Sequence, residues 1–479
     1  MKNTLSLMEN KKKILYTVCL WLFVAAGLFL AIAQPCAGLD DTGNIVLGAF
    51  VVTLTVWVFR PGGGSFTIGV AILILGGMIA GLPMVEMTSG FTSPSLWLLI
   101  PAMFFGYTLL KTGLGKRIVF FLFKGFNPTY KRLLAGWFIV GVLFSLLTPS
   151  ITVRFLILTP IAVSVADACR LDKGHKGRSL IVISAWAASV FPGTAWLNGS
   201  LYGPLFTSYL PEGLMRDLAT PQMWLKAMGP PWLLFSAIFL SAIYLFLKPD
   251  HELAVTREDM IKMYDELGPA SRDEKICLAV FVLMLMALAA QSFLPYTTNQ
   301  VLLGGFIILL FSGVLTAKDI TQGIGWDTVM FFGCILGMSR LLATSGISDW
   351  VAPVLKALLD PIAANGLLFV LALYGLCLVL RFFDVTQGWI IAAILTLATP
   401  MLYEVYGIHP LICLMVFICA GNLFFFHYHQ PWIGQAEAVI GDRGWAGRHL
   451  QKASVIYAIL AALLLIACRF YWQLIGLWG

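Results

Sequence analysis

Long apolar runs, separated by glycines, prolines and charged residues, recur along this chain of 479 residues. A run of about 20 apolar residues is long enough for a helix to cross a bilayer. Lipid offers the backbone no hydrogen bonds, so within the membrane such runs are restricted to helices. We therefore predict an all-α, polytopic membrane protein with eleven crossings, at residues 14–33, 43–59, 66–82, 94–110, 180–198, 230–247, 276–294, 301–316, 327–343, 410–426 and 454–472.

The composition supports a membrane protein and argues against several kinds of partner. Hydrophobic residues make up 59% of the chain and charged residues 11%, against roughly 25% charged residues in soluble proteins. The net charge of +7 comes from Lys and Arg in short loops, which membrane topology explains without a nucleic-acid partner. The nine cysteines show no CxxC spacing, so we expect neither a disulfide framework nor a zinc site. We expect no cofactor, apart from Na⁺ as a coupling ion.

The basic residues predict an orientation. Lys11, Lys12 and Lys13 precede a 20-residue apolar run, which is longer than the core of a usual signal peptide and predicts a retained first span. If 133–166 and 365–402 are re-entrant hairpins and the N-terminus is cytoplasmic, 24 of the 31 Lys and Arg residues fall in cytoplasmic loops. We expect an integral protein of a prokaryotic inner membrane, with its C-terminus outside.

The two hairpins divide the chain into an inverted repeat. We expect an N-terminal tail and first span at residues 1–42, a first repeat at 43–247, a cytoplasmic linker at 248–275 and a second repeat at 276–479. An odd number of crossings separates the equivalent spans, so the second hairpin opens on the opposite side from the first. Within the linker, residues 254–267 predict a surface helix.

Each hairpin contains an apolar stretch that stops short of a crossing and carries hydroxyl groups beside an arginine. The first stretch, 143–154, ends in Thr148-Pro149-Ser150-Ile151-Thr152-Val153-Arg154, and the second, 379–389, contains Arg381-Phe382-Phe383-Asp384-Val385-Thr386-Gln387-Gly388. Backbone breaks occur at membrane depth where the chain lines a cavity or is buried in protein, and charges there are costly. Paired breaks in the two halves therefore predict a transport site.

Arg154 is the leading candidate for binding an anion. It follows the hydroxyls of Ser150 and Thr152 at a break where the N-terminal end of a half-helix also favours negative charge. The structural alternative is an arginine that snorkels to the membrane interface. Arg381 is a second candidate, with pairing to Asp384 as its alternative. Three further residues are expected to contribute polar groups to the substrate site: Thr194, Asn198 and Thr386.

Asp384 is the carboxylate expected at membrane depth. It would coordinate a cation such as sodium, carry a proton, or neutralise Arg381 or Arg340. The other candidate ion-coupling residues are Ser150, Thr386 and Gln387.

His427 and His429 lie near the cytoplasmic end of the 410–426 span. They have no Cys or carboxylate at ligand spacing, so we expect no metal site. They are possible members of the substrate site, and the alternative is an ordinary interfacial pair.

These segments resemble the divalent anion:sodium symporter family, especially its 2-oxoglutarate/malate translocator branch, over residues 66–472. Pro149-Ser150-Ile151-Thr152-Val153-Arg154 is similar to the Pro-Ser-Asn-Thr-Ala-Arg hairpin tip of that branch. Lys111-Thr112-Gly113-Leu114-Gly115-Lys116-Arg117 resembles the region of its fourth span, and Phe426-His427-Tyr428-His429 lies where the branch has Thr-His-Tyr-Gly. The chain departs from the family at Ile151, where the family has asparagine, and at the second tip, Asp384-Val385-Thr386.

The resemblance implies a homodimer in which a transport domain holding both hairpins moves against a scaffold domain. It also implies that Ser150, Thr152 and Thr386 border substrate and sodium sites. The loss of both tip asparagines weakens the prediction of sodium at these positions, and proton coupling and anion exchange stay open as alternatives.

We therefore predict a secondary active transporter of small divalent organic anions such as succinate, malate or 2-oxoglutarate. It would work by sodium-coupled symport or anion exchange, through alternating access. The alternatives are an inorganic oxyanion carrier for sulfate, a proton-coupled carrier and an anion channel. We do not expect an enzyme, because no convincing paired carboxylates, Ser/His arrangement or metal ligands are found at membrane depth.

Overall fold

A computed structural model describes residues 2–61, 65–210, 217–249, 252–290, 294–382, 398–426 and 429–478. Every regular element within these ranges is a helix, which confirms the predicted all-α class. Eight helical segments in them are long and apolar enough to cross a membrane. Four shorter apolar helices lie at Phe66–Ile79, Thr298–Phe311, Gly366–Leu380 and Pro410–Gly421. The predicted number of eleven crossings stays a prediction.

The first half of the chain has a helix at or near each predicted span. The helices of this half are α1 (Lys2–Ala33), α2 (Asp41–Phe59), α3 (Phe66–Ile79), α4 (Met84–Met87), α5 (Pro94–Thr112), α6 (Leu114–Phe123), α7 (Tyr130–Leu147), α8 (Ile151–Ala168), α9 (Lys176–Val190), α10 (Tyr202–Tyr209) and α12 (Pro221–Phe246).

The linker and the second half contain the remaining helices. They are α13 (Arg257–Asp265), α14 (Arg272–Ala290), α15 (Thr298–Phe311), α16 (Ala317–Gln322), α17 (Trp326–Leu336), α18 (Met338–Thr344), α19 (Ile347–Ala363), α20 (Gly366–Leu380), α22 (Thr399–Tyr406), α23 (Pro410–Gly421), α24 (Pro431–Ile440) and α25 (Gly447–Leu474).

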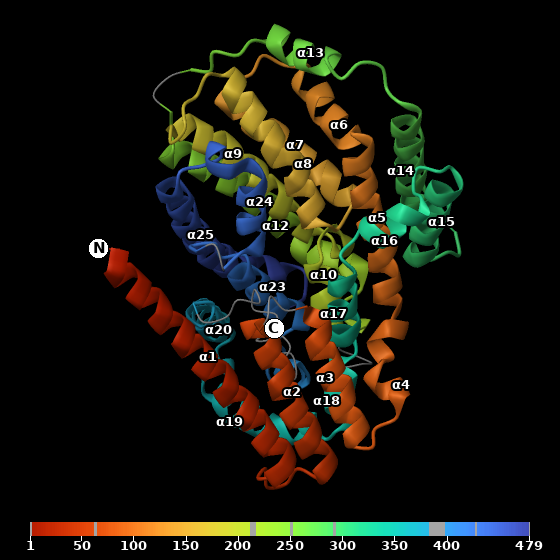
Figure 1. The fold of residues 1–479 in the computed structure, drawn as a ribbon, viewed down its shortest axis with the longest axis vertical. Coiled ribbons are helices and arrows are strands. Elements are labelled where there is room, and N and C mark those ends of the chain that lie inside the picture. Colours follow the sequence, from red (N-terminus) through yellow and green to blue (C-terminus); the bar gives the residue numbers. More distant parts are fainter. Residues whose placement is uncertain are drawn as a thin grey trace.

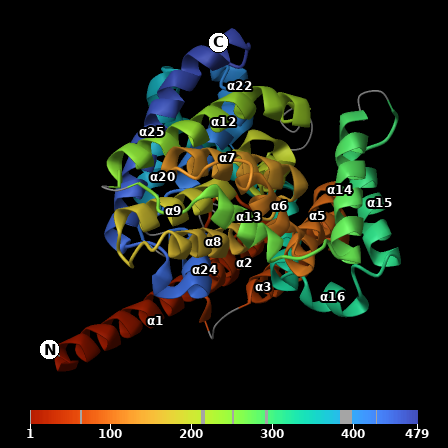
Figure 2. The same ribbon diagram turned by 90° about the horizontal axis from the view of Figure 1, so that it is seen from above.

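The helices form a bundle with two projecting parts (Figures 1 and 2). Helix α1 runs out from the bundle and packs on α2, and α14 and α15 form a hairpin on one flank beside α5. Helix α13 lies at one end, against α6. Its position confirms the predicted surface helix in the linker, where Thr256 and Asp259 form a capping box at its start.

The α7–α8 pair matches the first predicted hairpin. Helix α7 ends at Leu147 because Pro149 disfavours a helical conformation at Thr148, which is extended with φ −153° and ψ 133°. Ser150 then caps α8 by accepting a hydrogen bond from the Val153 N–H. Helices α7 and α8 have 18 residues each, and each is long enough by itself to cross a membrane. The re-entrant arrangement of this pair therefore stays a prediction.

The predicted continuous span at 180–198 differs from the structure. Helix α9 ends at Val190 and is followed by two 3-10 turns, Pro192–Ala195 and Leu197–Gly199. A proline has no N–H for the helical ladder, so Pro192 helps to end α9 here. The chain is therefore irregular in the interior of the bundle, and this break positions the candidate site.

Contacts between distant loops bring together residues that the predicted orientation places on the same side. The Lys173 ammonium lies 2.6 Å from the Asp442 carboxylate, and both belong to predicted cytoplasmic loops. Lys226 donates to the Ile475 carbonyl at 3.2 Å, and both are predicted to lie outside. The side of the membrane on which each pair of loops lies stays a prediction.

Cysteine labelling tests this orientation. Cysteines replacing the exposed residues Lys131 and Lys176 should react with an impermeant reagent only from the cytoplasmic side, and those replacing Lys226 and Lys356 only from the other. Labelling of Lys131→Cys and Lys176→Cys from opposite sides would contradict the paired arms of α7 and α8. Arg178 is unsuitable for labelling because it is buried and donates to Asp167.

Candidate functional site

The tip between α7 and α8 is held from behind by α5. The Thr148 hydroxyl donates to the Ala102 carbonyl at 3.2 Å and accepts from the Ser150 N–H at 3.1 Å. A Cβ at Gly106 would lie 2.7 Å from the Thr148 hydroxyl oxygen, so only glycine lets α5 approach the tip this closely. The tip is thereby fixed with the buried Ser150 at the N-terminal end of α8.

Arg154 lies in the first turn of α8 with its side chain 0% exposed. Its Nη1 donates to the Gly199 carbonyl at 2.8 Å. Its Nε and Nη2 have no hydrogen-bond partner among the described residues, and no carboxylate within those ranges pairs with it. A buried cation without a counter-charge is costly, so this geometry favours a bound anion. The side chain is covered by protein and does not snorkel to an interface.

The irregular segment after α9 encloses the Arg154 guanidinium. A Cβ at Gly193 would lie 2.5 Å from Nη1 of Arg154 and 2.2 Å from the Gly199 carbonyl oxygen. The Trp224 indole N–H donates to the Thr194 carbonyl at 3.0 Å, and the Trp196 indole donates to the Ser145 carbonyl at 3.0 Å. Hydrogen bonds from two tryptophans, the buried Trp224 and the partly buried Trp196, therefore hold the unwound turn in place.

Two hydroxyl groups of this turn add unused hydrogen-bonding capacity. The side-chain oxygens of Thr194 and Ser200 are buried and have no partner among the described residues. Buried polar groups are normally hydrogen-bonded, and unpaired ones call for an explanation such as a ligand or water. Asn198 and Thr152 are partly exposed. Thr194 thus directly follows Gly193, the glycine that lies against the Arg154 guanidinium of α8.

The second half supplies another buried arginine. Arg381 caps the C-terminal end of α20, is 0% exposed, and donates to the carbonyl of His429. The His429 ring is buried too and packs edge-on against Phe382, with ring centroids 5.1 Å apart. The His429 side chain therefore lies in the interior of the protein.

Sequence reasoning missed a polar cluster at the end of α23. The carbonyl oxygen of the Asn422 side chain accepts from the Tyr202 hydroxyl at 3.1 Å and from the Gln430 amide at 3.2 Å. The Asn422 amide nitrogen is buried and has no partner in the described ranges. Gly421 and Pro431 flank this break in the chain. A glycine and a proline at these positions could have indicated that the helix ends near Asn422. The apolar residues as far as Phe426 instead favoured one continuous span at 410–426.

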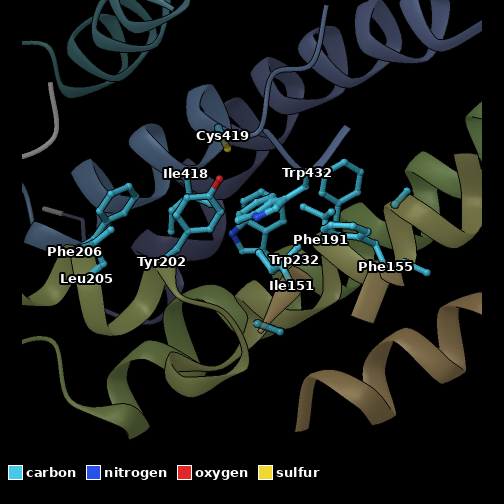
Figure 3. Packing of buried hydrophobic residues seen from close by; sticks show 14 of the residues in the cluster. Ile151, Phe155, Phe191, Tyr202, Leu205, Phe206, Trp232, Ile418, Cys419 and Trp432 are labelled. Atoms are coloured by element: carbon cyan, nitrogen blue, oxygen red, sulfur yellow. The ribbon is translucent and has the colours of Figure 1, made fainter. Parts of the chain in front are cut away.

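The two halves meet across an apolar interior, shown in Figure 3. Ile151 and Phe155 of α8 lie in the same buried cluster as Tyr202 of α10 and Trp432 of α24. The ring centroids of Tyr202 and Trp432 are 5.8 Å apart and the rings are nearly perpendicular. Tyr202 also follows Gly199 by three residues, so the α10 region connects the surroundings of Arg154 with the cluster around Asn422.

Several predicted residues lie outside the described ranges, namely Asp384, Thr386, Gln387 and His427. Arg340 has Glu86 as a partner, with Nε 2.6 Å from the carboxylate, so it does not depend on Asp384 for a counter-charge. Within the described part of the chain no group of three or more His, Cys, Asp or Glu side chains is placed to hold a metal ion.

Comparison with known proteins identifies relatives over nearly the whole chain. The family model described as the sodium:sulfate symporter transmembrane region matches residues 11–478. A protein of Cupriavidus necator named "Membrane protein" is 25% identical, over 93% of this chain and 90% of its own length. The putative malate transporter YflS of Bacillus subtilis is 24% identical, over 73% of this chain and 74% of its own length.

Two further comparisons concern a plant protein and a solved structure. Dicarboxylate transporter 1 of Arabidopsis thaliana chloroplasts is 24% identical, over 68% of this chain and 60% of its own length. The crystal structure of the YdaH transporter of Alcanivorax borkumensis superimposes with a TM-score of 0.56 at 14% identity, over 84% of this chain and 90% of that one. This similarity extends to the fold alone.

Proposed function

This chain belongs to the sodium:sulfate symporter transmembrane family, and on that premise we propose that it is a secondary active transporter of small divalent organic anions. The observation that carries the proposal is the fully buried Arg154, which has no carboxylate partner in the described ranges and keeps Nε and Nη2 unpaired. These two atoms form one edge of the guanidinium, which matches the two oxygens of a carboxylate.

A second negative charge fits the second half of the site. Arg381 contributes a buried positive charge, and the nearby Asn422 amide is an unpaired donor within the described residues. Each half therefore provides one arginine and at least one further polar group. Two separate groups of donors suit a dicarboxylate, whose two charges lie at opposite ends of the molecule. They suit a compact anion less well, because its charge is concentrated at a single point.

The order of the elements supports an inverted repeat with alternating access. In the first half α5 is followed by Gly113, with φ +81°, and then by α6 and the α7–α8 pair. In the second half α18 is followed by Gly346, with φ +71°, and then by α19, α20 and α22. A broken helix comes next in both halves, α9 in the first and α23 in the second. Repeats of this kind place the substrate between the halves.

The relatives' names support a dicarboxylate, because they include a putative malate transporter and chloroplast dicarboxylate transporters. Sulfate is the second candidate, favoured by the description of the family. We further propose a homodimer, as the family resemblance implies, in which the domain carrying the hairpins moves.

Uptake into proteoliposomes tests the substrate and the coupling together. Labelled succinate, malate, citrate and sulfate are offered separately under a sodium gradient, a proton gradient and an opposing gradient of unlabelled anion. We expect saturable accumulation of the dicarboxylates under one of these gradients. Uptake of sulfate alone would contradict the proposed substrate class, and non-saturable flux without accumulation would indicate a channel.

Asp384 is proposed as the coupling residue, in company with Thr386 and Gln387. Its carboxylate would bind sodium as a charged oxygen ligand, or bind a proton, and Asp384→Asn removes both possibilities at nearly constant shape. We expect this variant to lose gradient-driven accumulation while exchange of internal for external substrate persists. The measurement is concentrative uptake beside counterflow in the same vesicles.

The control for Asp384→Asn is Asp360→Asn, the same chemical change at a partly exposed carboxylate that pairs with Lys356 and accepts from the Tyr406 hydroxyl. It should leave both activities unchanged. Full accumulation by Asp384→Asn, with the parent's dependence on sodium and pH, would exclude the coupling role. A structural ion pair with Arg381 would instead appear as a destabilised Asp384→Asn protein that Arg381→Gln restores.

A further inference from the structure

A groove lies between α7 and α12, away from the candidate site. It has a volume of about 490 Å³, within the range of roughly 300–1,000 Å³ that small-molecule sites usually occupy. Most of its lining is apolar and comes from Leu134, Ala135, Phe138, Ala237, Leu240 and Leu245. Both helices are long and apolar enough to span a membrane.

The groove opens on a face that is itself apolar. Ile139 of α7 is 52% exposed, and Leu234 and Phe246 of α12 are 60% and 69% exposed. Such residues are stable in contact with lipid, and their positions along both helices continue the apolar lining outward. An occupant of the groove therefore enters from the lipid phase.

One end of the groove is polar and positively charged. Lys131 lines it, with Nζ 5.9 Å from the centre of the Tyr244 ring, and Ser241 lies on the same wall. Lys131 belongs to the first turn of α7, where the helix dipole also favours negative charge. Neither α7 nor α12 contains an Asp or Glu to neutralise it.

We propose that this groove binds one phospholipid with an anionic headgroup. The phosphate would lie against Lys131 and the hydroxyls of Ser241 and Tyr244, and an acyl chain would follow Leu134, Phe138 and Leu240. Charge complementarity selects this occupant, because a basic pocket between membrane helices attracts anionic headgroups and zwitterionic lipids lack the net charge. A water-soluble dicarboxylate has no apolar chain that could fill the apolar part of the groove.

Photo-crosslinking of the intact transporter in vesicles tests the proposal. Vesicles of phosphatidylethanolamine contain a trace of phosphatidylglycerol or phosphatidylcholine with a photoreactive acyl chain, and crosslinked peptides are identified by mass spectrometry. We expect phosphatidylglycerol to label the α7 and α12 peptides several-fold more than phosphatidylcholine. Lys131→Gln should reduce that labelling about fivefold, the factor for loss of one cation near an anionic headgroup.

Two further variants define the site. Ala237→Trp fills the groove, so labelling of these peptides by both lipids should be lost. Arg132→Ala removes a neighbouring exposed cation that does not line the groove, and labelling should stay near the parent value. Equal labelling by the two lipids in the parent protein, or unchanged labelling in Lys131→Gln, would overturn the proposed anionic lipid. Folding of each variant is checked by its elution as a single species in detergent.

Discussion

Replacing Arg154 with lysine is expected to weaken transport severely, although the positive charge is kept. The guanidinium offers a planar pair of donors to a carboxylate, whereas an ammonium acts as a compact charge and cannot keep the bond to the Gly199 carbonyl as well. Hydrogen bonds to charged groups contribute about 1.5–3 kcal/mol each, so we expect the apparent affinity to fall by about 10- to 100-fold. Initial uptake rates over a range of substrate concentrations measure this.

Arg340→Lys is the matched control, because Arg340 is 43% exposed and pairs with Glu86 on the surface. Its uptake should remain close to that of the parent protein. Thermal unfolding in detergent separates binding from folding, because a bound substrate raises the unfolding temperature of the native protein. If Arg154→Lys is folded and still gains thermal stability from substrate as the parent does, Arg154 does not bind the anion.

Gly193→Ala is expected to have the second largest effect. The added Cβ would lie 2.2 Å from the Gly199 carbonyl oxygen and 2.5 Å from Nη1 of Arg154, so the turn and the guanidinium must separate. Overpacking of this kind costs about 1–3 kcal/mol. We expect uptake to be nearly lost and the unfolding temperature to fall. Both are measured on protein purified in parallel with the parent.

Gly304→Ala serves as the control for Gly193→Ala, because a Cβ at Gly304 of α15 meets nothing within 4 Å. Alanine also favours a helix more than glycine does, so stability should be unchanged or slightly higher. Normal uptake by Gly193→Ala would mean that the unwound turn does not hold Arg154 in its working position.

The amino-acid sequence determined the class of the fold and the break between α7 and α8. Apolar runs of spanning length restrict the backbone to helices in lipid, and the break at Pro149 with a capping Ser150 is a local consequence of proline and serine chemistry. Arg154 could be chosen as a candidate site residue from sequence alone, because a charged residue beside a helix break at membrane depth indicates a functional site. These features depend on residues adjacent in the chain.

Only the tertiary structure decided which distant groups surround Arg154. The Gly199 carbonyl is 45 residues away in sequence, and the contact between Tyr202 and Asn422 spans 220 residues. The break after α23 also escaped detection, because apolar residues on both sides of Asn422 resemble one continuous span. Local sequence determines where a helix starts and stops. Packing decides which buried donors remain unpaired, and in this protein the proposal of an anion site rests on those donors.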